Sequence, residues 1–298
     1  KKTLMKVKEF LKLVEIQTKV ASVLPLFIGF LYSRLTFGSF QGFPSLLFFL
    51  SLLCLDMGTT ALNHYSDFEK DQIGHGYGYE EHNPMSANQL HKTTARRTIL
   101  LLFFFSFVFG ILLVWQTDYV VLLLGLFSAA MAFLYSKGPV PISYTPFGEL
   151  FSGTLMGGVI FFIAVYIQNT KKGWIVYEGA GRLSLQLDVL LQLLFVSLPL
   201  VLGIANIMLA NNICDREEDV LNGRHTLVSY LGQKRAVVLF AMLQALALVI
   251  LLLLMVVGLF PWQGVVVFFA LPLFYKNTKV FMENPSKAKT FVSSVKNF

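Results

Sequence analysis

The stretch FPSLLFFLSLLCLDMGTTALNHYSDFEKD, residues 43–71, joins a long apolar segment to an acidic end. Its first part has the roughly twenty mostly apolar residues that an α-helix needs to cross a lipid bilayer. Asn63, Asp67 and Asp71 follow at intervals of four residues. We therefore predict a membrane-spanning helix, and its carboxylates need an explanation because charged groups in a membrane are costly and usually functional.

The whole chain has the composition of a polytopic membrane protein. Of its 298 residues, 55% are hydrophobic and 14% are charged, and the mean hydropathy is +0.65, well above the range of soluble globular domains. Eight segments are long and apolar enough to span a bilayer. They lie near 13–35, 44–66, 98–116, 119–136, 147–168, 188–210, 236–258 and 260–275.

These segments predict an all-α helical bundle in one domain, with a weak repeat that relates residues 1–140 to residues 141–298. The chain begins at Lys1, and its last residues, NPSKAKTFVSSVKNF at 284–298, have the pattern of a basic loop that leads into a further apolar helix. We expect a ninth span in the full-length protein. Two cysteines, Cys54 and Cys214, provide no disulfide framework.

The basic residues predict the orientation of the chain. Most lysines and arginines fall at the N-terminus, in the loops near 67–97, 137–146 and 211–235, and after residue 275, which places these parts in the cytoplasm by the positive-inside rule. The net charge of +7 then reflects topology and attraction to anionic lipids rather than nucleic-acid binding. We expect a multi-pass protein of the cell membrane.

The acidic motif of the first stretch occurs twice. NHYSDFEKD at 63–71 follows the second span, and NNICDREED at 211–219 follows the sixth; both have the pattern N-x-x-x-D-x-x-x-D. This spacing places the three polar residues of each motif on one helical face. We predict that the two motifs face a common central cavity.

The motifs offer carboxylate and amide oxygens, and no set of thiolates or imidazoles accompanies them at ligand spacing. These oxygen ligands favour magnesium as the bound metal. Mg²⁺ is usually held by one or two carboxylates together with substrate phosphates, so two acidic helix ends suggest a bound diphosphate. A single acidic run at a helix end is more often a solvated cap. The matching spacing of two copies favours the metal site.

Basic residues near these motifs are candidates for contact with an anion. Lys19 lies inside the first span, where an ammonium group is functional by default, and we expect it to face either the carboxylates or a substrate anion. Lys137, next to Tyr135, ends the fourth span, although a lysine there also serves as a topology anchor. Arg97 and Arg224 are phosphate-binding candidates that positive-inside anchoring explains equally well. Asp56 lies within the second span. It is either a further residue of the acidic site or a residue that hydrogen bonds to a neighbouring helix.

The paired motifs resemble those of the UbiA-type intramembrane aromatic prenyltransferases. LYSKGPVPISYTPFGEL at 134–150 and NNICDREEDVLNGRHTLVSYLG at 211–232 are similar to the 1,4-dihydroxy-2-naphthoate polyprenyltransferases of menaquinone synthesis. The resemblance implies an isoprenyl diphosphate bound through Mg²⁺, with metal ligands at Asn63, Asp67, Asp71, Asp215 and Asp219. Contacts to the diphosphate are expected from Asn63, Lys19, Lys137, Arg97, Asn211 and Arg224.

The implied reaction is a Mg²⁺-dependent polyprenyl transfer to 1,4-dihydroxy-2-naphthoate, with loss of CO₂ and diphosphate, that gives demethylmenaquinone. Its catalytic candidates are Asp71 as proton acceptor, Lys19 and Lys137 as partners of the leaving diphosphate, and Tyr135. Two departures from the relatives concern binding: Cys214 stands where arginine is common, and Arg224-His225 replaces Lys-Arg or Lys-Asn.

Other functions remain open at the level of sequence. A related prenyltransferase would use 4-hydroxybenzoate, haem or a chlorin as acceptor. From a different class, a cation-coupled transporter also has paired motifs in a repeated helical bundle. The D-x-x-D-G-x-x-A-R array of the phosphatidyl-alcohol phosphotransferases is not found in the sequence.

Overall fold

The computed structural model describes residues 5–71, 85, 90–136, 140–179, 182–221 and 223–298, apart from the side chains of residues 67, 69–71, 177, 178, 182 and 183. Eight of the described helices are long and apolar enough to cross a membrane, which confirms the predicted helical membrane fold. They are Ile16–Phe37, Gly42–Ser66, Lys92–Gln116, Tyr119–Ser136, Gly148–Tyr166, Leu187–Cys214, Gln233–Val256 and Trp262–Glu283.

The predicted boundaries shift most at the eighth span, which ends at Glu283 rather than near residue 275, and next at the third span. The helix begins at Lys92 rather than near residue 98, because lysine and arginine are good helix formers and the helix continues beyond its apolar part. Many large apolar side chains of the spanning helices are exposed, Phe107 and Phe269 among them. This is expected where lipid, and not water, contacts the protein.

The chain divides into two compact units, each described by itself. Unit 1 comprises Lys1–Val23 and Gly42–Gly125, and unit 2 comprises Leu24–Gln41 and Leu126–Phe298. The division does not follow the repeat predicted from the motifs, which remains a prediction. The first acidic motif belongs to unit 1 and the second to unit 2.

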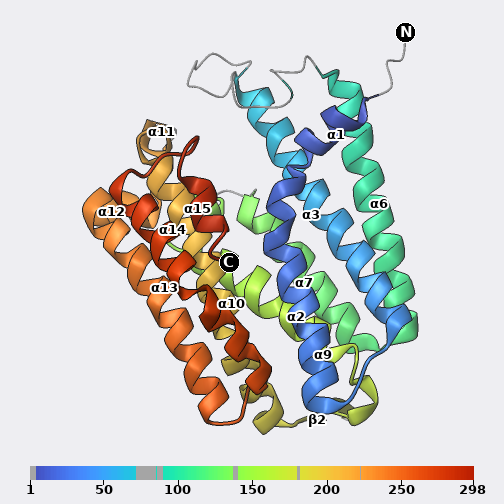
Figure 1. Ribbon diagram of the computed structural model, residues 1–298. Helices are drawn as coiled ribbons and strands as arrows, with labels where there is room; N and C mark the ends of the chain where they lie inside the picture. Colours follow the sequence, from blue (N-terminus) through green and yellow to red (C-terminus); the bar gives the residue numbers. More distant parts are fainter. Residues whose placement is uncertain (1–4, 72–84, 86–89, 137–139, 180–181, 222) are drawn as a thin grey trace. The chain divides into compact units, whose positions relative to one another are not determined.

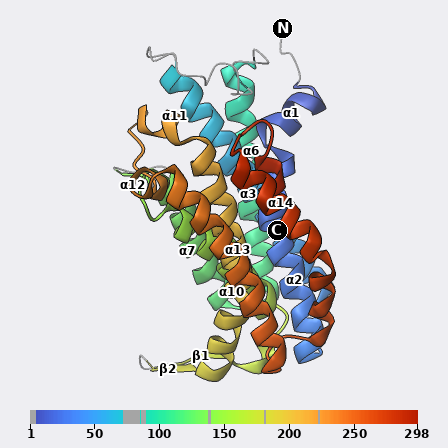
Figure 2. The same ribbon diagram turned by 60° about the vertical axis from the view of Figure 1, so that its left-hand side comes forward.

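Unit 1 is built around two long helices, α3 (Gly42–Asp71) and α6 (Lys92–Gln116), which lie side by side in both views (Figures 1 and 2). Its other elements are α1 (Val7–Leu13), η1 (Ile16–Lys19), the first turn of α2 (Val20–Phe37) and the start of α7 (Tyr119–Ser136). Ser51 of α3 and Ser106 of α6 each donate a hydroxyl hydrogen bond, 2.9 Å long, to the backbone carbonyl of the other. Such bonds between small residues hold helices together where lipid provides no hydrophobic driving force.

Unit 2 contains the rest of α2 and α7 and all later elements. These are η2 (Ile142–Tyr144), α8 (Gly148–Ser152), η3 (Gly153–Val159), α9 (Ile160–Tyr166), η4 (Thr170–Lys172), β1 (Ile175–Gly179), β2 (Arg182–Leu185), α10 (Leu187–Cys214), α11 (Arg216–Leu221), α12 (Leu227–Leu231), α13 (Gln233–Val256), η5 (Trp262–Ala270), α14 (Leu271–Glu283) and α15 (Phe291–Val295). The long central helix α10 packs against α8, η3, α13 and α15.

The loop expected near residues 169–187 contains a short antiparallel hairpin. Ile175 of β1 pairs with Leu185 of β2, and the register shifts between Tyr177 and Gly179. Before the hairpin, the buried Trp174 packs on the Phe37 ring, with 5.0 Å between the ring centroids. These two aromatic side chains attach the hairpin to the end of α2.

The end of α10 that carries the second motif is fixed by a hydrophobic cluster. Leu209 and Ile213 of α10 pack with Phe240 of α13 and Phe281 of α14, and all four are almost fully buried. The rings of Phe240 and Phe281 are 4.6 Å apart. Residues 211–219 therefore begin from a rigidly packed helix end.

A π-helix, η3, brings the fifth span close to α10. Glycines make the approach possible, because a Cβ atom on Gly157 would lie 2.6 Å from the backbone nitrogen of Val201 and 2.7 Å from the carbonyl carbon of Leu200. Small residues at such crossings let helix backbones pack closely in membranes. The contact sets the position of α10, and α10 leads into the second motif.

We expect Gly157→Ala to destabilise the protein by about 1–3 kcal/mol, because the added methyl group overpacks a backbone contact that cannot move aside. The matched control is Gly158→Ala, whose Cβ would contact only side-chain atoms at 3.4 Å and beyond. Thermal unfolding of the detergent-solubilised variants measures both. Equal unfolding temperatures for the two variants would contradict the assigned contact.

Candidate active site

The second motif lies where α10 ends and α11 begins. Asn211 is in the last turn of α10, Asp215 caps that helix, and Asp219 belongs to α11. The helix predicted to carry all three residues is thus divided at Asp215. The backbone nonetheless keeps helical spacing, since the Asp215 and Asp219 amides donate to the carbonyls of Asn211 and Asp215. The Asn211 amide also donates a 3.1 Å bond to Asp215 Oδ2, so these two side chains point the same way.

A tight turn after α11 returns Arg224 to the motif. Gly223 adopts the left-handed conformation, with φ of 69°, which glycine accommodates without strain. The Arg224 amide then donates to the Asp219 carbonyl at 2.8 Å, and its guanidinium Nη1 lies 3.4 Å from Asp219 Oδ1. The guanidinium also stacks 4.5 Å from the centroid of the Tyr144 ring. Arg224 is thus positioned on a carboxylate of the motif, and its predicted contact with phosphate remains a prediction.

Behind the motif lies a second group of polar side chains. Glu149 is buried in α8 and accepts a 2.9 Å hydrogen bond from the Asn212 amide through Oε1; its Oε2 has no hydrogen-bond partner among the described residues. Tyr135, near the end of α7, lies near Ser152 and Glu149. The catalytic role predicted for Tyr135 remains a prediction.

Asn211 and Asp215 already converge on a cation. The ammonium group of Lys287 donates to Asn211 Oδ1 and, at 2.6 Å, to Asp215 Oδ2. Sequence reasoning did not select Lys287, because it lies 72 residues beyond Asp215 in a tail whose basic residues indicated only topology. Glu149 and Tyr144 were missed too, although both occur in the quoted segment 134–150.

The donor atoms of the second motif suit a magnesium ion. The oxygens of Asn211 and Asp215 bind one cation together, and Asp219 Oδ2 is buried without a hydrogen-bond partner in the described part of the chain. Burial raises the pKa of Asp219 to about 6, although Arg224 opposes the shift; a cation would relieve this cost. No group of three His, Cys, Asp or Glu side chains among the described residues is arranged to hold a metal. Magnesium commonly obtains its remaining ligands from water and phosphate.

The first motif continues α3 without a break to Asp71. Asn63 is exposed on this helix, whereas the side chains of Asp67 and Asp71 lie outside the described part of the structure, and so does Lys137. Arg97, on α6, is exposed. The roles predicted for these five residues remain predictions.

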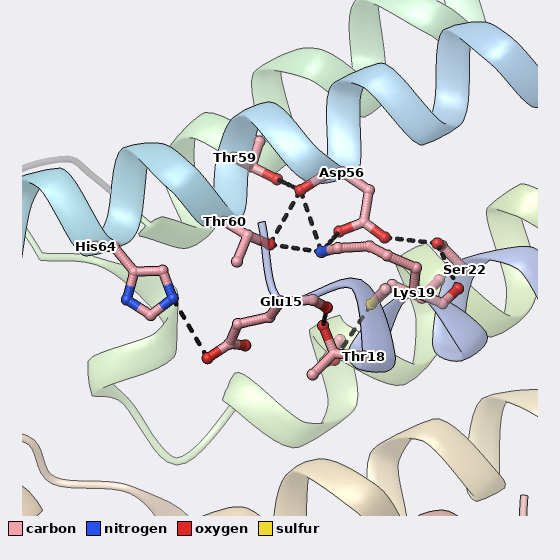
Figure 3. Close-up of polar contacts among 10 residues, drawn as sticks. Glu15, Thr18, Lys19, Ser22, Asp56, Thr59, Thr60 and His64 are labelled. Carbon is pink, nitrogen blue, oxygen red and sulfur yellow. Dashed lines mark hydrogen bonds and ion pairs between the residues drawn. The ribbon is translucent and has the colours of Figure 1, made fainter. Parts of the chain in front are cut away.

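Lys19 is held in a buried polar cluster of unit 1 (Figure 3). Its side chain is 5% exposed, and its ammonium donates to Asp56 Oδ1 at 2.7 Å and to Thr60 Oγ1 at 2.6 Å. Ser22 donates to the other carboxylate oxygen of Asp56 at 2.5 Å. About two helical turns beyond Asp56 along α3, His64 Nε2 lies 3.3 Å from Glu15 Oε1. Lys19 therefore faces the carboxylate of Asp56, which precedes the motif, and its predicted contact with the diphosphate remains a prediction.

Comparisons with known proteins agree with this architecture. The chain is 32% identical over 277 residues to the "1,4-dihydroxy-2-naphthoate octaprenyltransferase" of Bacillus subtilis (strain 168), an alignment that covers 90% of this chain and 80% of that protein. Among solved structures, a UbiA homolog from Aeropyrum pernix K1 matches with a TM-score of 0.71 at 17% identity over 95% of this chain and 94% of its own. A UbiA homolog from Archaeoglobus fulgidus bound to GPP and Mg²⁺ matches with a TM-score of 0.64 at 14% identity, over 97% and 96%.

At these identities the solved structures show a common fold, and the sequence matches show the family. The family described as the UbiA prenyltransferase family matches residues 22–297, almost the entire chain. A transferase is therefore favoured over the cation-coupled transporter. With the 32% identity to the Bacillus protein, this match shows that the chain belongs to the UbiA prenyltransferase family.

Proposed function

We propose that this protein transfers a polyprenyl group from an isoprenyl diphosphate to 1,4-dihydroxy-2-naphthoate, with release of diphosphate and CO₂, to give demethylmenaquinone in its quinol form. The observation that carries the acceptor assignment is the name of the Bacillus relative at 32% identity. The second motif supports the diphosphate half of the reaction. We place both motifs on the cytoplasmic side of the cell membrane, where the basic loops lie.

The second motif would hold one Mg²⁺ through Asn211 and Asp215, with Asp219 close to it. The first motif, Asn63, Asp67 and Asp71, would hold another. The Archaeoglobus homolog of the same fold is bound to GPP and Mg²⁺, which supports this cofactor. When bound, the metal neutralises the diphosphate and makes it a better leaving group.

Residues of the chain then have separate tasks. Arg224, anchored between Asp219 and the Tyr144 ring, presents N–H groups to phosphate oxygens. The apolar surroundings keep water from the allylic centre as its C–O bond breaks. The naphthoate ring attacks through the carbon that bears the carboxylate, and the electrons of the lost C–CO₂ bond restore aromaticity. CO₂ takes the place of a leaving ring proton, so Asp71, our candidate proton acceptor, would take a ring hydroxyl proton as the carbon attacks and return it once CO₂ has left. Lys137 and Tyr135 remain candidates beside the leaving group.

Lys19 has a structural task in this proposal. Its ammonium donates hydrogen bonds to Asp56 and Thr60, and these bonds fix the start of α2 against α3. Asp56 lies seven residues before Asn63 in the sequence. Contact with the diphosphate would first require the loss of a buried ion pair, which costs several kcal/mol. Lys19 thereby holds in place the part of α3 that leads into the first motif.

The purified protein, incubated with Mg²⁺, a polyprenyl diphosphate and 1,4-dihydroxy-2-naphthoate, is expected to yield a product with the mass of the prenylated and decarboxylated ring. Mass spectrometry of parallel incubations with 4-hydroxybenzoate tests the acceptor. Product formed only from 4-hydroxybenzoate would contradict the acceptor assignment, and no product from either acceptor would contradict the enzyme assignment.

Asp215→Asn is expected to lower Mg²⁺-dependent turnover by about 100-fold or more, because it removes a charged ligand from the site where leaving-group charge develops. Glu218→Gln is the matched control, since Glu218 is exposed three residues further along the chain; its turnover should equal that of the wild type. Circular dichroism checks that both variants fold. Wild-type turnover in Asp215→Asn would remove this residue from the metal site.

For the buried pair, Lys19→Met and Asp56→Asn are each expected to destabilise the protein by about 3–5 kcal/mol, because each leaves a buried group without its partner. The double variant Lys19→Met/Asp56→Leu should recover much of that loss, since an apolar pair can replace a buried ion pair. Unfolding in a denaturing detergent measures all three. A stable Lys19→Met variant that has lost diphosphate binding would instead assign Lys19 to the substrate.

A further inference from the structure

Lys287 is presented to the second motif by a compact turn between α14 and α15. The Ser286 amide donates to Thr290 Oγ1 at 2.8 Å, and Thr290 Oγ1 donates to the Asn284 carbonyl at 2.7 Å. The Lys287 ammonium also lies 5.2 Å from the centroid of the Phe291 ring. Local hydrogen bonds and a cation–π contact thus shape this turn.

Apolar packing holds the same segment on α10. Phe281, before the turn, is fully buried in the cluster with Leu209, Ala210 and Ile213 of α10, and Phe291, after the turn, packs against that cluster. Helix α15 itself packs on α10, and Figure 1 shows the two helices side by side within unit 2. The turn is therefore anchored on both sides of Lys287, directly over Asn211 and Asp215.

The Lys287 ammonium binds the two oxygen atoms that we assign to a magnesium ion, Asn211 Oδ1 and Asp215 Oδ2. A metal ion and an ammonium group cannot share both oxygens, since each needs direct contact and the two repel each other. Lys287 can move away, because its side chain is 48% exposed and lysine has a long flexible stem. Arrival of the metal would leave the ammonium beside the motif without its carboxylate.

Under the proposed function, a diphosphate binds to that same metal. Its oxygens would lie beside the displaced ammonium, and a lysine readily binds phosphate as a point charge. We propose that Lys287 exchanges partners during the reaction cycle: it neutralises Asn211 and Asp215 when the metal is absent and binds the diphosphate when the metal is present. The C-terminal segment thereby contributes a substrate-binding residue to the site.

The experiment compares wild-type protein, Lys287→Gln and Lys289→Gln in lipid nanodiscs. Lys289 is the matched control, because it is exposed in the same segment and has no ion pair in the described part of the chain. Binding of Mn²⁺ alone is measured by electron paramagnetic resonance, and binding of inorganic diphosphate at saturating Mg²⁺ by calorimetry. Neither readout requires an acceptor or turnover.

We expect Lys287→Gln to bind Mn²⁺ roughly fivefold more tightly than wild type, since a competing ion pair is removed, and to bind diphosphate about tenfold more weakly, since a charged hydrogen bond is lost. Lys289→Gln should match wild type in both. Unchanged or weaker Mn²⁺ binding in Lys287→Gln would overturn the proposal, and so would unchanged diphosphate binding or equal effects in Lys289→Gln. Wild-type protein that binds both ligands but transfers no prenyl group would overturn the proposed function alone.

Discussion

The second motif depends on compensation for the charge of two carboxylates four residues apart, Asp215 and Asp219. Asp219 is 3% exposed, and burial raises its pKa to about 6. Each carboxylate has its own cation from a different part of the chain: Lys287 for Asp215, and Arg224 for Asp219. The turn at Gly223 brings Arg224 to Asp219. The C-terminal segment, packed on α10, brings Lys287 to Asp215. In the proposed enzyme, a bound metal would compensate the charge of Asp215 in place of Lys287, and the diphosphate would bind to that metal.

Much of the fold was predictable from the sequence, because a bilayer imposes a length and a composition on every helix that crosses it. All eight spans follow from apolar runs, and the second and sixth end at the repeated acidic motif. The misses are local. Lys92 extends its helix through residues that hydropathy counts as loop, and the π-helix at Gly153–Val159 and the hairpin at Ile175–Leu185 leave no periodic signal in a short segment.

The candidate site was predictable only in part, for a reason visible in particular residues. Equal spacing identified Asn211, Asp215 and Asp219, since positions four apart in a helix are neighbours. Lys287 and Glu149 meet the motif only through tertiary packing, of α15 on α10 and of α8 on α10, and nothing in the sequence near either residue records it. Lys19 shows the opposite case. Its place in an apolar span indicated a charged partner. The partner is Asp56, which lies seven residues before the first acidic motif begins at Asn63.

The central claim is that a divalent cation takes the place of Lys287 at Asn211 and Asp215 and binds the diphosphate there. The most direct measurement is a crystal structure with Mn²⁺ and a non-hydrolysable prenyl diphosphate analogue, recorded at a wavelength where manganese scatters anomalously. We predict an anomalous peak within coordination distance of Asp215, with the analogue's diphosphate attached to it and Lys287 turned toward the phosphate oxygens. A bound diphosphate without manganese at Asp215, and with Lys287 still on Asn211 and Asp215, would contradict the account.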